Sequence, residues 1–393
     1  MGKQQTELVP PHGGKLSPLL ISDEQEKKAL RANASSWKAI QLNSKAESDV
    51  IMMATGAYSP LQGFMKQEDY SSVRDHMRMA DGLLWPIPVT LPVKSELAAT
   101  LKVGEEISLL SEASQEVMAV MTIDEIFNYD KDEEALNVFA TTDRSHPGVA
   151  KICEQGDTYL AGPVRVLNEC GYPETYSEFA RPADTRKLFM EKGWRTIAAF
   201  QTRNPIHRSH EYLTKVALEL CDGLLIHPVV GKLKEGDIPA QVRMDCYHAM
   251  MDNYYNKDRT ALKVYPIEML YGGPREAILH AIIRQNFGCS HMIIGRDHAG
   301  VGDFYGAFEA QEIFETLKPD DLHLKPINMD WTFWCYKCET IVSAKTCPHD
   351  HRDHLMISGT KLRDMLAAGD RPPVEFSRPE VIDILSAYYR DIK

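Results

Sequence analysis

The sequence predicts an α/β protein with three parts, and three observations support that division. In residues 181–325, near-continuous apolar runs alternate with helical segments, which is the pattern of a parallel, doubly wound sheet. Residues 1–180 lack this alternation and contain short alternating runs between turn residues, which favours a mainly β region with a few helices. Residues 326–393 form a smaller module that contains a cluster of cysteines and histidines.

The composition narrows the function before any motif is considered. The net charge of −12 argues against a nucleic-acid partner, which needs a broad basic face. No apolar run approaches the length of a membrane span, and residues 1–20 lack the apolar stretch of a signal peptide. Eight cysteines in 393 residues do not make a disulfide scaffold. We expect a cytoplasmic protein that captures any anion in a locally basic pocket.

In the N-terminal region, strands are predicted from alternating apolar and polar residues. Trp85–Leu91 and Glu116–Met121 show this alternation and are bounded by turn residues. No internal repeat or low-complexity tract interrupts the region. We therefore expect a mainly β domain with a few helices.

The central region has four predicted strands, and the segments that follow them are the first places to look for a ligand. The strands are expected at residues 196–200, 224–229, 262–265 and 291–294, and the helices at 208–221, 240–256 and 274–287. Sheets of this kind bind ligands outside the carboxyl ends of their strands. The segments 201–211 and 295–300 both occupy that position.

The segment Gln201–Glu211 reads Gln-Thr-Arg-Asn-Pro-Ile-His-Arg-Ser-His-Glu and joins a strand to a helix. Pro205 suits the first turn of that helix, and a helix start offers free N–H groups and a positive dipole end. His207 and His210 are expected on one helix face. The segment predicts binding of phosphate or a similar oxyanion. A solvated helix start is the plainer alternative, and a zinc site is disfavoured because no third ligand stands nearby.

The second candidate segment is the glycine-rich loop Gly295–Asp303. Its glycines permit close approach of the backbone to a ligand. Arg296 and His298 add donors for an anion, and Asp297 can hold an arginine or a ribose hydroxyl. Glycine is common in ordinary turns, so this loop gains weight only beside the first segment.

The third candidate is a metal site. Cys335, Cys338, Cys347 and His351 provide four soft ligands within 17 residues, which suits a closed tetrahedral zinc site of structural type. His349 or His354 is an alternative to His351 as the fourth ligand. Three thiols without metal are the plainer interpretation.

Two further segments admit ordinary explanations. Ser358-Gly359-Thr360 is interpreted as a helix cap, which needs no ligand. The loop Gly231–Asp237 follows a strand on the predicted ligand edge. Its Lys232 and Lys234 either contact a polyphosphate or are solvated, and the sequence does not decide between these.

These motifs resemble the ATP sulfurylase (sulfate adenylyltransferase) family. Gln-Thr-Arg-Asn-Pro-x-His-Arg-x-His-Glu at 201–211 and Gly-Arg-Asp-His-Ala-Gly at 295–300 are similar to that family's two defining motifs. Weaker agreements extend along most of the chain, at residues 11–14, 56–65, 146–149 and 357–363. The resemblance implies a PUA-like N-terminal domain, a Rossmann-like catalytic domain of the HxGH nucleotidyltransferase type, and a small C-terminal α/β domain. Some bacterial members are similar in carrying a Cys/Cys/Cys/His zinc knot.

The resemblance also implies a reaction, in which ATP and sulfate give adenosine 5′-phosphosulfate (APS) and diphosphate with Mg²⁺. By motif, sulfate would be held by Gln201, Arg203 and the backbone of Ala299. The catalytic set would be Thr202, Arg203, Asn204, His207 and His210. The nucleotide site would comprise Gln201, Asn204, His207, His210, Gly295, Arg296, Asp297, His298 and Met329. Residues 326–330 depart from the family's fungal pattern, which affects the assignment of Met329 as the adenine contact.

The same resemblance implies a symmetric homo-oligomer, most simply a dimer. An APS kinase activity is not expected, because the chain has no Gly-x4-Gly-Lys-Ser/Thr motif. The physiological direction, which would be assimilation or sulfur oxidation, is not fixed by the sequence.

Charge repulsion sets the mechanism we expect. Sulfate is a dianion and must approach the α-phosphorus of a polyanion. Two like unit charges about 4 Å apart repel each other by about 4 kcal/mol at an effective dielectric constant near 20. Arg203, Arg296, the two histidines, the helix start and Mg²⁺ would offset that repulsion. We therefore expect direct in-line displacement without a covalent enzyme intermediate. No general base is needed, because sulfate is already ionised.

Three other functions fit parts of the sequence. One is another adenylyltransferase of the same superfamily, acting on a phosphorylated metabolite. A nucleotide-sensing relative that kept the fold is disfavoured by the joint presence of the arginines and histidines at 201–211 and 295–300. A zinc-module nucleic-acid binder is opposed by the acidic net charge.

Overall fold

A five-stranded parallel sheet forms the centre of the protein. The computed structural model describes residues 7–112, 114–231, 237–357 and 359–391. The sheet has the strand order β10-β9-β8-β11-β12, and every neighbouring pair is parallel. Its strands are β8 (Ile197–Thr202), β9 (Gly223–Pro228), β10 (Thr260–Leu262), β11 (His291–Ile294) and β12 (Lys325–Asn328). The predicted doubly wound sheet is confirmed.

The strand order reverses between β8 and β11, because the chain first builds outward from β8 to β10 and then returns to the other side of β8. Four helices accompany the strands: α8 (Pro182–Glu191), α9 (Arg208–Leu220), α10 (Ala240–Tyr254) and α11 (Gly273–Asn286). The bounds of α9, α10 and α11 agree with the three predicted helices to within about two residues, and α8 was not predicted. The fifth strand, β12, was not predicted, and the expected domain boundary after residue 325 falls at its first residue.

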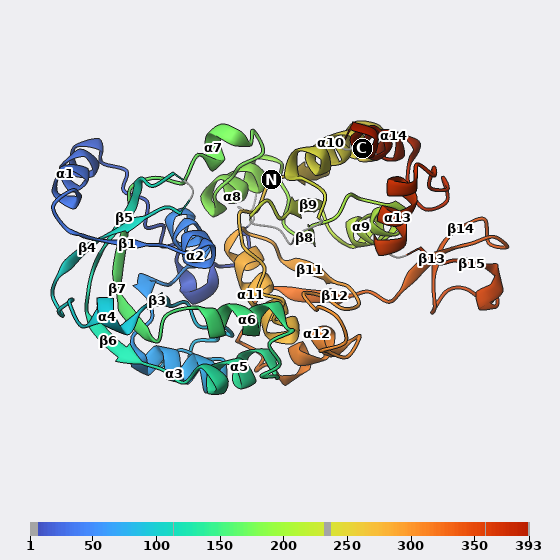
Figure 1. The fold of residues 1–393 in the computed structure, drawn as a ribbon. Coiled ribbons are helices and arrows are strands. Elements are labelled where there is room, and N and C mark those ends of the chain that lie inside the picture. The colour runs from blue at the N-terminus through green and yellow to red at the C-terminus, as the bar shows by residue number, and fades with distance from the viewer. Residues whose placement is uncertain (1–6, 113, 232–236, 358, 392–393) are drawn as a thin grey trace.

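The N-terminal region is built around a second, mixed sheet of seven strands (left side of Figure 1). Strands β1 and β4 are parallel, and the other pairs are antiparallel. The strands are β1 (Lys38–Gln41), β2 (Gly63–Phe64), β3 (Leu91–Val93), β4 (Glu106–Leu110), β5 (Val117–Thr122), β6 (Glu125–Asn128) and β7 (Thr158–Val166). The helices are η1 (His12–Gly14), α1 (Glu24–Ala34), α2 (Ser44–Thr55), α3 (Gln67–His76), α4 (Ser95–Ala98), α5 (Lys131–Phe139), α6 (Pro147–Glu154) and α7 (Tyr172–Thr175).

The predicted sheet is present, but the region is mixed α/β and not mainly β, because more of its described residues lie in helices than in strands. One predicted strand was also wrong. Trp85–Leu91 pairs with a strand only at its end, where Leu91 begins β3. The stretch before it is irregular and buried, and the Trp85 indole donates to the carbonyl of Ile87. The alternation that suggested a strand therefore reflects burial of apolar side chains in a segment without ladder hydrogen bonds.

The C-terminal region projects beyond the central sheet at the right of Figure 1. A small antiparallel sheet is followed by two helices, and α14 packs beside α10. Its elements are β13 (Thr332–Cys335), β14 (Thr340–Ser343), η3 (His351–Asp353), β15 (His354–Leu355), α13 (Gly359–Ala368) and α14 (Pro379–Asp391). The short helices α12 (Glu309–Glu312) and η2 (Ile313–Thr316) belong to the central region and pack against α11. The predicted cap at Ser358 and the Lys232–Lys234 loop lie outside the described residues. No helix in the described ranges is both long and apolar enough to cross a membrane.

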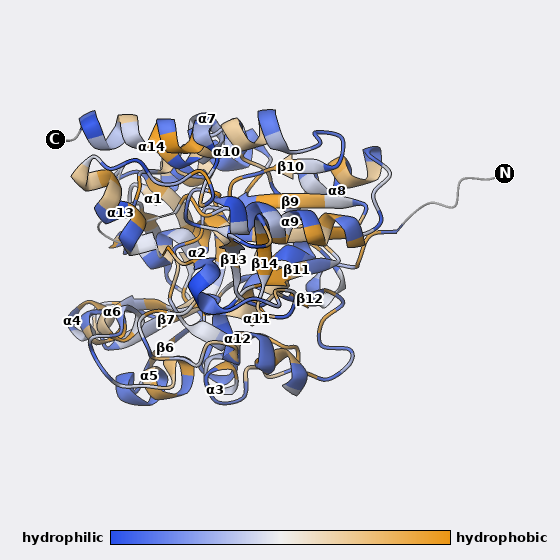
Figure 2. Ribbon diagram, turned by 90° about the vertical axis from the view of Figure 1, so that its right-hand side faces the viewer, coloured by the Kyte–Doolittle hydropathy of each residue, from blue (hydrophilic) through white to orange (hydrophobic). Residues whose placement is uncertain are grey.

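Helix α11 joins the two large sheets, because it is buried from Glu276 to its end at Asn286. On one side, Ile278 and Ile282 belong to the core of the N-terminal region. On another, Ala277 and Ala281 pack in the core beneath the parallel sheet. The parallel sheet is itself apolar, and its buried strand β9 is mainly orange in Figure 2. The two sheets thus share one helix as a common internal layer.

The end of α11 is tied to the N-terminal region by a single amide side chain. Asn286 is fully buried, and its Oδ1 accepts a hydrogen bond from the backbone N–H of His12 at 2.8 Å. Its Nδ2 donates to the carbonyls of Ala57 and Ser59 at 2.9 and 3.0 Å. Three backbone groups from two separate segments, at His12 and at residues 57–59, therefore depend on this one residue.

Replacing Asn286 by alanine should lower the free energy of unfolding by about 3 kcal/mol, because it leaves three buried backbone groups without partners. Urea denaturation measures the loss. The control is Asn253→Ala, since Asn253 makes one exposed bond within its own helix, to Ala249. Equal losses in the two variants would contradict this role for Asn286.

Candidate active site

A cavity of about 720 Å³ opens at the carboxyl ends of β8 and β11, where the strand order reverses. This is the position at which doubly wound sheets bind ligands. It is lined by three parts of the chain: the turn after β8, the loop after β11, and the region from Asp330 onward. From the first two parts the lining residues include Gln201, Thr202, Arg203, Asn204, His207, His210, Gly295, Arg296, Asp297, His298 and Ala299.

The turn after β8 differs in one respect from the prediction. Helix α9 begins at Arg208 with His207 as its N-cap, so Pro205 precedes the helix and does not lie in its first turn. No side chain caps the helix start, although the N–H of Arg208 donates to the carbonyl of Phe376. The chain between β8 and α9 is held by Thr202, whose hydroxyl bonds to the N–H and carbonyl of Asn204.

His207 and His210 lie together at this helix start. Their rings stack with centroids 3.7 Å apart, and Phe376 and Phe200 pack on the outer sides. Burial lowers the pKa of His207 well below its usual value and lowers that of His210 to about 4. Both rings are therefore neutral at neutral pH. Their Nδ1 atoms are buried without a hydrogen-bond partner, a state that a bound ligand commonly relieves.

Arg203 is oriented by Asp237 and Tyr271. Its Nη1 donates to Asp237 at 2.9 Å and to the Tyr271 hydroxyl at 3.3 Å, and the guanidinium lies 5.4 Å from the Tyr271 ring centre. Both hydrogen bonds are donated by Nη1, so they orient the guanidinium group of Arg203 without using Nη2. Asp237 was named in the sequence analysis as the end of the loop Gly231–Asp237 without a role, and Tyr271 was not named there. No motif marks Asp237 or Tyr271, because each comes from a loop far from the 201–211 segment in the chain.

The loop after β11 has two non-glycine residues with left-handed backbone conformation, Asp297 (φ 54°) and Ala299 (φ 56°). Such positions carry strain and are concentrated at functional sites. Arg296 reaches Asp297 at 3.3 Å, and its guanidinium lies 4.3 Å from the ring centre of Trp331. Arg203 and Arg296 therefore line the same cavity, one from each loop.

The sequence of this chain matches models of two known protein families. A family model described as ATP-sulfurylase matches residues 177–388, and one described as a PUA-like domain matches residues 9–169. The chain belongs to the ATP-sulfurylase family. Among curated relatives, the sulfate adenylyltransferase of Desulforamulus reducens is 50% identical, with 98% of this chain and 99% of the relative covered. That of Chlorobium chlorochromatii is 51% identical, with 98% and 96% covered.

A solved structure agrees with this family at the level of the whole chain. A hexameric APS kinase from Thiobacillus denitrificans superposes with a TM-score of 0.74 at 27% identity. The alignment covers 97% of this chain and 68% of that one. The fold class expected from the sequence, with a PUA-like N-terminal domain and an ATP-sulfurylase catalytic domain, is thereby confirmed.

The adenine contact predicted at or near Met329 remains a prediction. Met329 lies just after β12, where its N–H donates to Ile294, and it is not among the residues that line the cavity. Asp330 and Trp331 line the cavity instead, and the Trp331 side chain is half exposed there. The aromatic ring beside Arg296 was missed because a lone tryptophan carries no motif.

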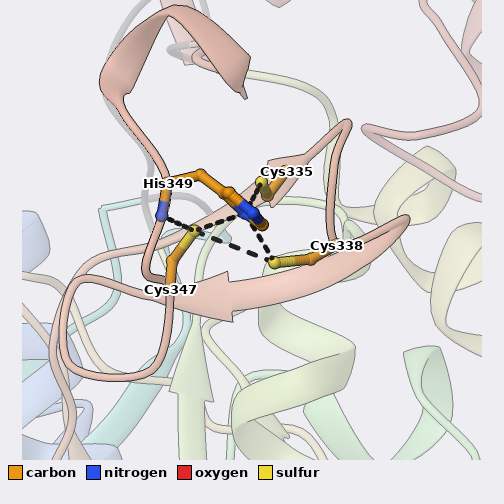
Figure 3. Close-up of side chains that lie close together, drawn as sticks. All are labelled: Cys335, Cys338, Cys347 and His349. Atoms are coloured by element: carbon orange, nitrogen blue, oxygen red, sulfur yellow. Dashed lines mark hydrogen bonds between the residues drawn. The ribbon is translucent and has the colours of Figure 1, made fainter.

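The cysteine cluster forms as predicted except for its fourth member. The cluster comprises Cys335, Cys338, Cys347 and His349, whose ligand atoms lie within 4.8 Å of one another (Figure 3). His351 is outside it: its ring is largely exposed and pairs with Asp350 at 2.9 Å. The reason is local, because η3 begins at His351 and turns that residue away from β13. His354 contacts Cys347 but stacks on Phe333.

The distances within the cluster suit zinc. Thiolates 2.3 Å from zinc at tetrahedral corners are about 3.8 Å apart, and the sulfurs of Cys338 and Cys347 are 3.9 Å apart. His349 Nδ1 lies 3.2 and 3.4 Å from the sulfurs of Cys338 and Cys335. Four protein ligands leave no open position, so the metal would be structural. Because β13 carries both Cys335 and three cavity-lining residues, such a metal would also stabilise one wall of the cavity.

The purified protein should contain one zinc ion per chain, measured by elemental analysis. His349→Ala should lower the zinc content strongly because it removes a ligand. His351→Ala is the matched control and should retain full occupancy, since that ring faces solvent. Loss of zinc from the His351 variant alone would contradict the ligand set seen in the structure.

The neutral histidines predict how stability depends on pH. The pKa of His210 is about 4 in the folded state and 6.5 ordinarily. Between these values the unfolded chain binds more protons, so the free energy of unfolding should fall as the pH is lowered through this window. Replacing His210 by glutamine should make this dependence shallower in denaturant titrations. An unchanged slope would show that burial of His210 does not contribute.

Proposed function

We propose that the protein is a sulfate adenylyltransferase that joins ATP and sulfate to give APS and diphosphate. The observation that carries this proposal is that Arg203 and Arg296 line a single cavity together with His207 and His210. Its position at the strand-order reversal suits a nucleotide, and its charge suits a second anion beside it. The relatives at about 50% identity over nearly the whole chain bear the name of this activity.

The cavity supplies the charge that the reaction needs. Sulfate must approach a polyanion, and the two arginines offset the repulsion that opposes this approach. The histidines contribute differently from the arginines, because burial keeps both rings neutral before a ligand binds. They would donate hydrogen bonds to phosphate oxygens, and a bound polyanion would favour their protonation. Among these four side chains, the positive charge thus resides on the two arginines.

The roles of individual residues follow from their positions around the cavity. Sulfate would contact Gln201, Arg203 and the backbone of Ala299. The phosphates would contact His207 and His210, and Thr202 and Asn204 would shape the turn between β8 and α9. Gly295, Arg296, Asp297 and His298 would line the nucleotide, with Trp331 in place of Met329 nearest the base. These assignments combine the family resemblance with cavity lining.

The chemistry we propose is in-line displacement at the α-phosphorus. Sulfate is ionised at neutral pH, so the reaction needs positioning and electrostatic stabilisation more than proton transfer. Mg²⁺ would enter with ATP. Among the described residues, the cysteine cluster is the sole group of three or more potential ligands with metal-site spacing.

The oligomeric state and the location remain predictions. We expect a second copy of the chain as partner, most simply in a dimer, which light scattering would test. We also expect a cytoplasmic location.

The activity is tested by ATP-dependent release of diphosphate from the purified protein. Sulfate or molybdate should support release, whereas phosphorylated metabolites such as nicotinamide mononucleotide should not. Release with a phosphorylated metabolite and none with sulfate would instead favour another adenylyltransferase of the same superfamily.

Arg203→Lys should keep the fold and lower the rate at least about a hundredfold, by analogy with the loss of one oxyanion donor. The reason is that lysine cannot reproduce the planar fork that contacts two oxygens at once. Steady-state assays measure the rate, and thermal unfolding checks the fold. Arg165→Lys is the control, because Arg165 pairs with Glu106 far from the cavity. Near-normal turnover by a folded Arg203→Lys protein would contradict the assignment.

A further inference from the structure

The short segment 270–273, just before α11, contacts both loops that form the sulfate part of the cavity. The Tyr271 hydroxyl and ring meet Arg203 in the turn after β8. Two residues further on, the N–H of Gly273 donates to the carbonyl of Ala299 at 3.0 Å, in the loop after β11. Arg203 and the backbone of Ala299 are two of the three groups assigned to sulfate. The conformation of this segment therefore bears on both.

Tyr271 has a backbone conformation that tyrosine rarely adopts. Its φ is 60°, in the left-handed region, where a bulky side chain crowds the backbone. Glycine would adopt the same conformation without that strain. Strained positions are concentrated at functional sites, and they persist where surrounding contacts impose them. A tyrosine at this position therefore directs attention to its side chain and to the groups that hold its backbone.

The peptide group between Tyr271 and Gly272 is held at both of its polar ends. Its N–H donates to the carboxylate of Glu276 at 2.9 Å, and that carboxylate also accepts from the N–H of Leu270 at 3.0 Å. Its carbonyl oxygen lies 3.0 Å from Nε2 of His146. Since Glu276 and His146 are both fully buried, water does not compete for these contacts.

His146 comes from the N-terminal region, where it is the N-cap of α6. Its Nδ1 accepts from the N–H of Gly148 at 3.1 Å, so its Nε2 carries the proton and donates to the Tyr271 carbonyl. The Tyr305 hydroxyl, 3.2 Å from the same nitrogen, shares this proton as an acceptor. Helix α6 comes this close because residue 148 is glycine: a Cβ there would lie 2.7 Å from the carbonyl oxygen of Leu270. One imidazole thus caps a helix of the N-terminal region and holds a peptide group beside the cavity.

We propose that His146, acting through Tyr271, is a positioning residue for Arg203 and hence for sulfate. Neither His146 nor Tyr271 is among the described residues that line the cavity, so their effect on a ligand is indirect. His146 and Glu276 hold the backbone conformation that presents the tyrosine ring to the guanidinium. The inference rests on the proposed function, because it takes Arg203 to contact sulfate. It gives residues 146–149, which had no role in the sequence analysis, a role at the site.

The first test separates the two tasks of His146. Asparagine is among the best N-cap residues, so His146→Asn should keep the cap of α6, but its shorter side chain does not reach the Tyr271 carbonyl. The ratio kcat/KM for sulfate should fall at least about fivefold, because misplacement of a substrate-contacting group is costly. The KM for ATP should stay within about twofold. Diphosphate release, with sulfate and ATP varied separately, measures both. The thermal midpoint should stay within about 3 °C, since few hydrogen bonds are lost.

A series at Tyr271 tests whether activity follows the side chain or the stability of the fold. Tyr271→Phe keeps the ring beside Arg203 and should change kcat/KM for sulfate less than about threefold. Tyr271→Ala and Tyr271→Gly both remove the ring and should lower that ratio at least about tenfold. The glycine variant should nevertheless unfold at a higher temperature than the alanine variant, because glycine relieves the left-handed conformation.

The control for the backbone effect is Ala140→Gly. Ala140 also has a left-handed conformation, with φ 57°, at the exposed end of α5, and it does not line the cavity. This variant should be at least as stable as the unmodified protein and have the same kinetics. If His146→Asn fails to fold, the series at Tyr271 still decides the question.

The outcomes distinguish this inference from the proposed function. Sulfate-dependent release that is unchanged in His146→Asn, or as fast in Tyr271→Gly as in the unmodified protein, would overturn the positioning role alone. A Tyr271→Gly protein both more stable and more active than Tyr271→Ala would also overturn it, since activity would then follow stability. No sulfate-dependent release by the unmodified protein would contradict the proposed function, and the positioning role with it.

Discussion

The complete burial of α11 between two sheets is the constraint on which the rest of the structure depends. Its apolar faces belong to two cores, and its amide Asn286 ties three separate backbone groups to its end. Because neither sheet can cover this helix alone, the seven-stranded and five-stranded sheets are fixed relative to each other. The same burial places ionisable side chains of α11 in a medium of low dielectric, where their hydrogen bonds are strong and directional.

The surroundings of each side chain in the cavity explain why its histidines are neutral and its arginines are charged. The histidine rings are enclosed by aromatic residues and lose most of their hydration, which disfavours the imidazolium form. A guanidinium resists deprotonation far more strongly, and Arg203 has a carboxylate partner in Asp237. The result is a site whose donors differ in kind, with permanent charge on the arginines and adjustable charge on the histidines.

Much of this could be predicted from the sequence, and the failures have identifiable physical causes. Four of the five strands of the central sheet were predicted because buried parallel strands are continuously apolar. Gln201–Glu211 and Gly295–Gly300 were identified because their polar residues interrupt that pattern at strand ends. Asp237, Tyr271 and Trp331 could not be found in this way, since each reaches the cavity from a separate loop. His146 was given no role because its contact with Tyr271 joins residues that are 125 positions apart in the chain. His349 and His351 differ only in where a short helix begins, and spacing does not determine that.

Helix α11 supports one side of the cavity but not the other. The floor of the cavity, formed by the segments after β8 and β11, belongs to cores that α11 joins to the N-terminal region. By contrast, β13 packs in a separate small core, of which Phe333, Cys335 and Val342 are the buried members. The two sides of the cavity therefore rest on different cores, and the β13 side depends on the small core around the cysteine cluster.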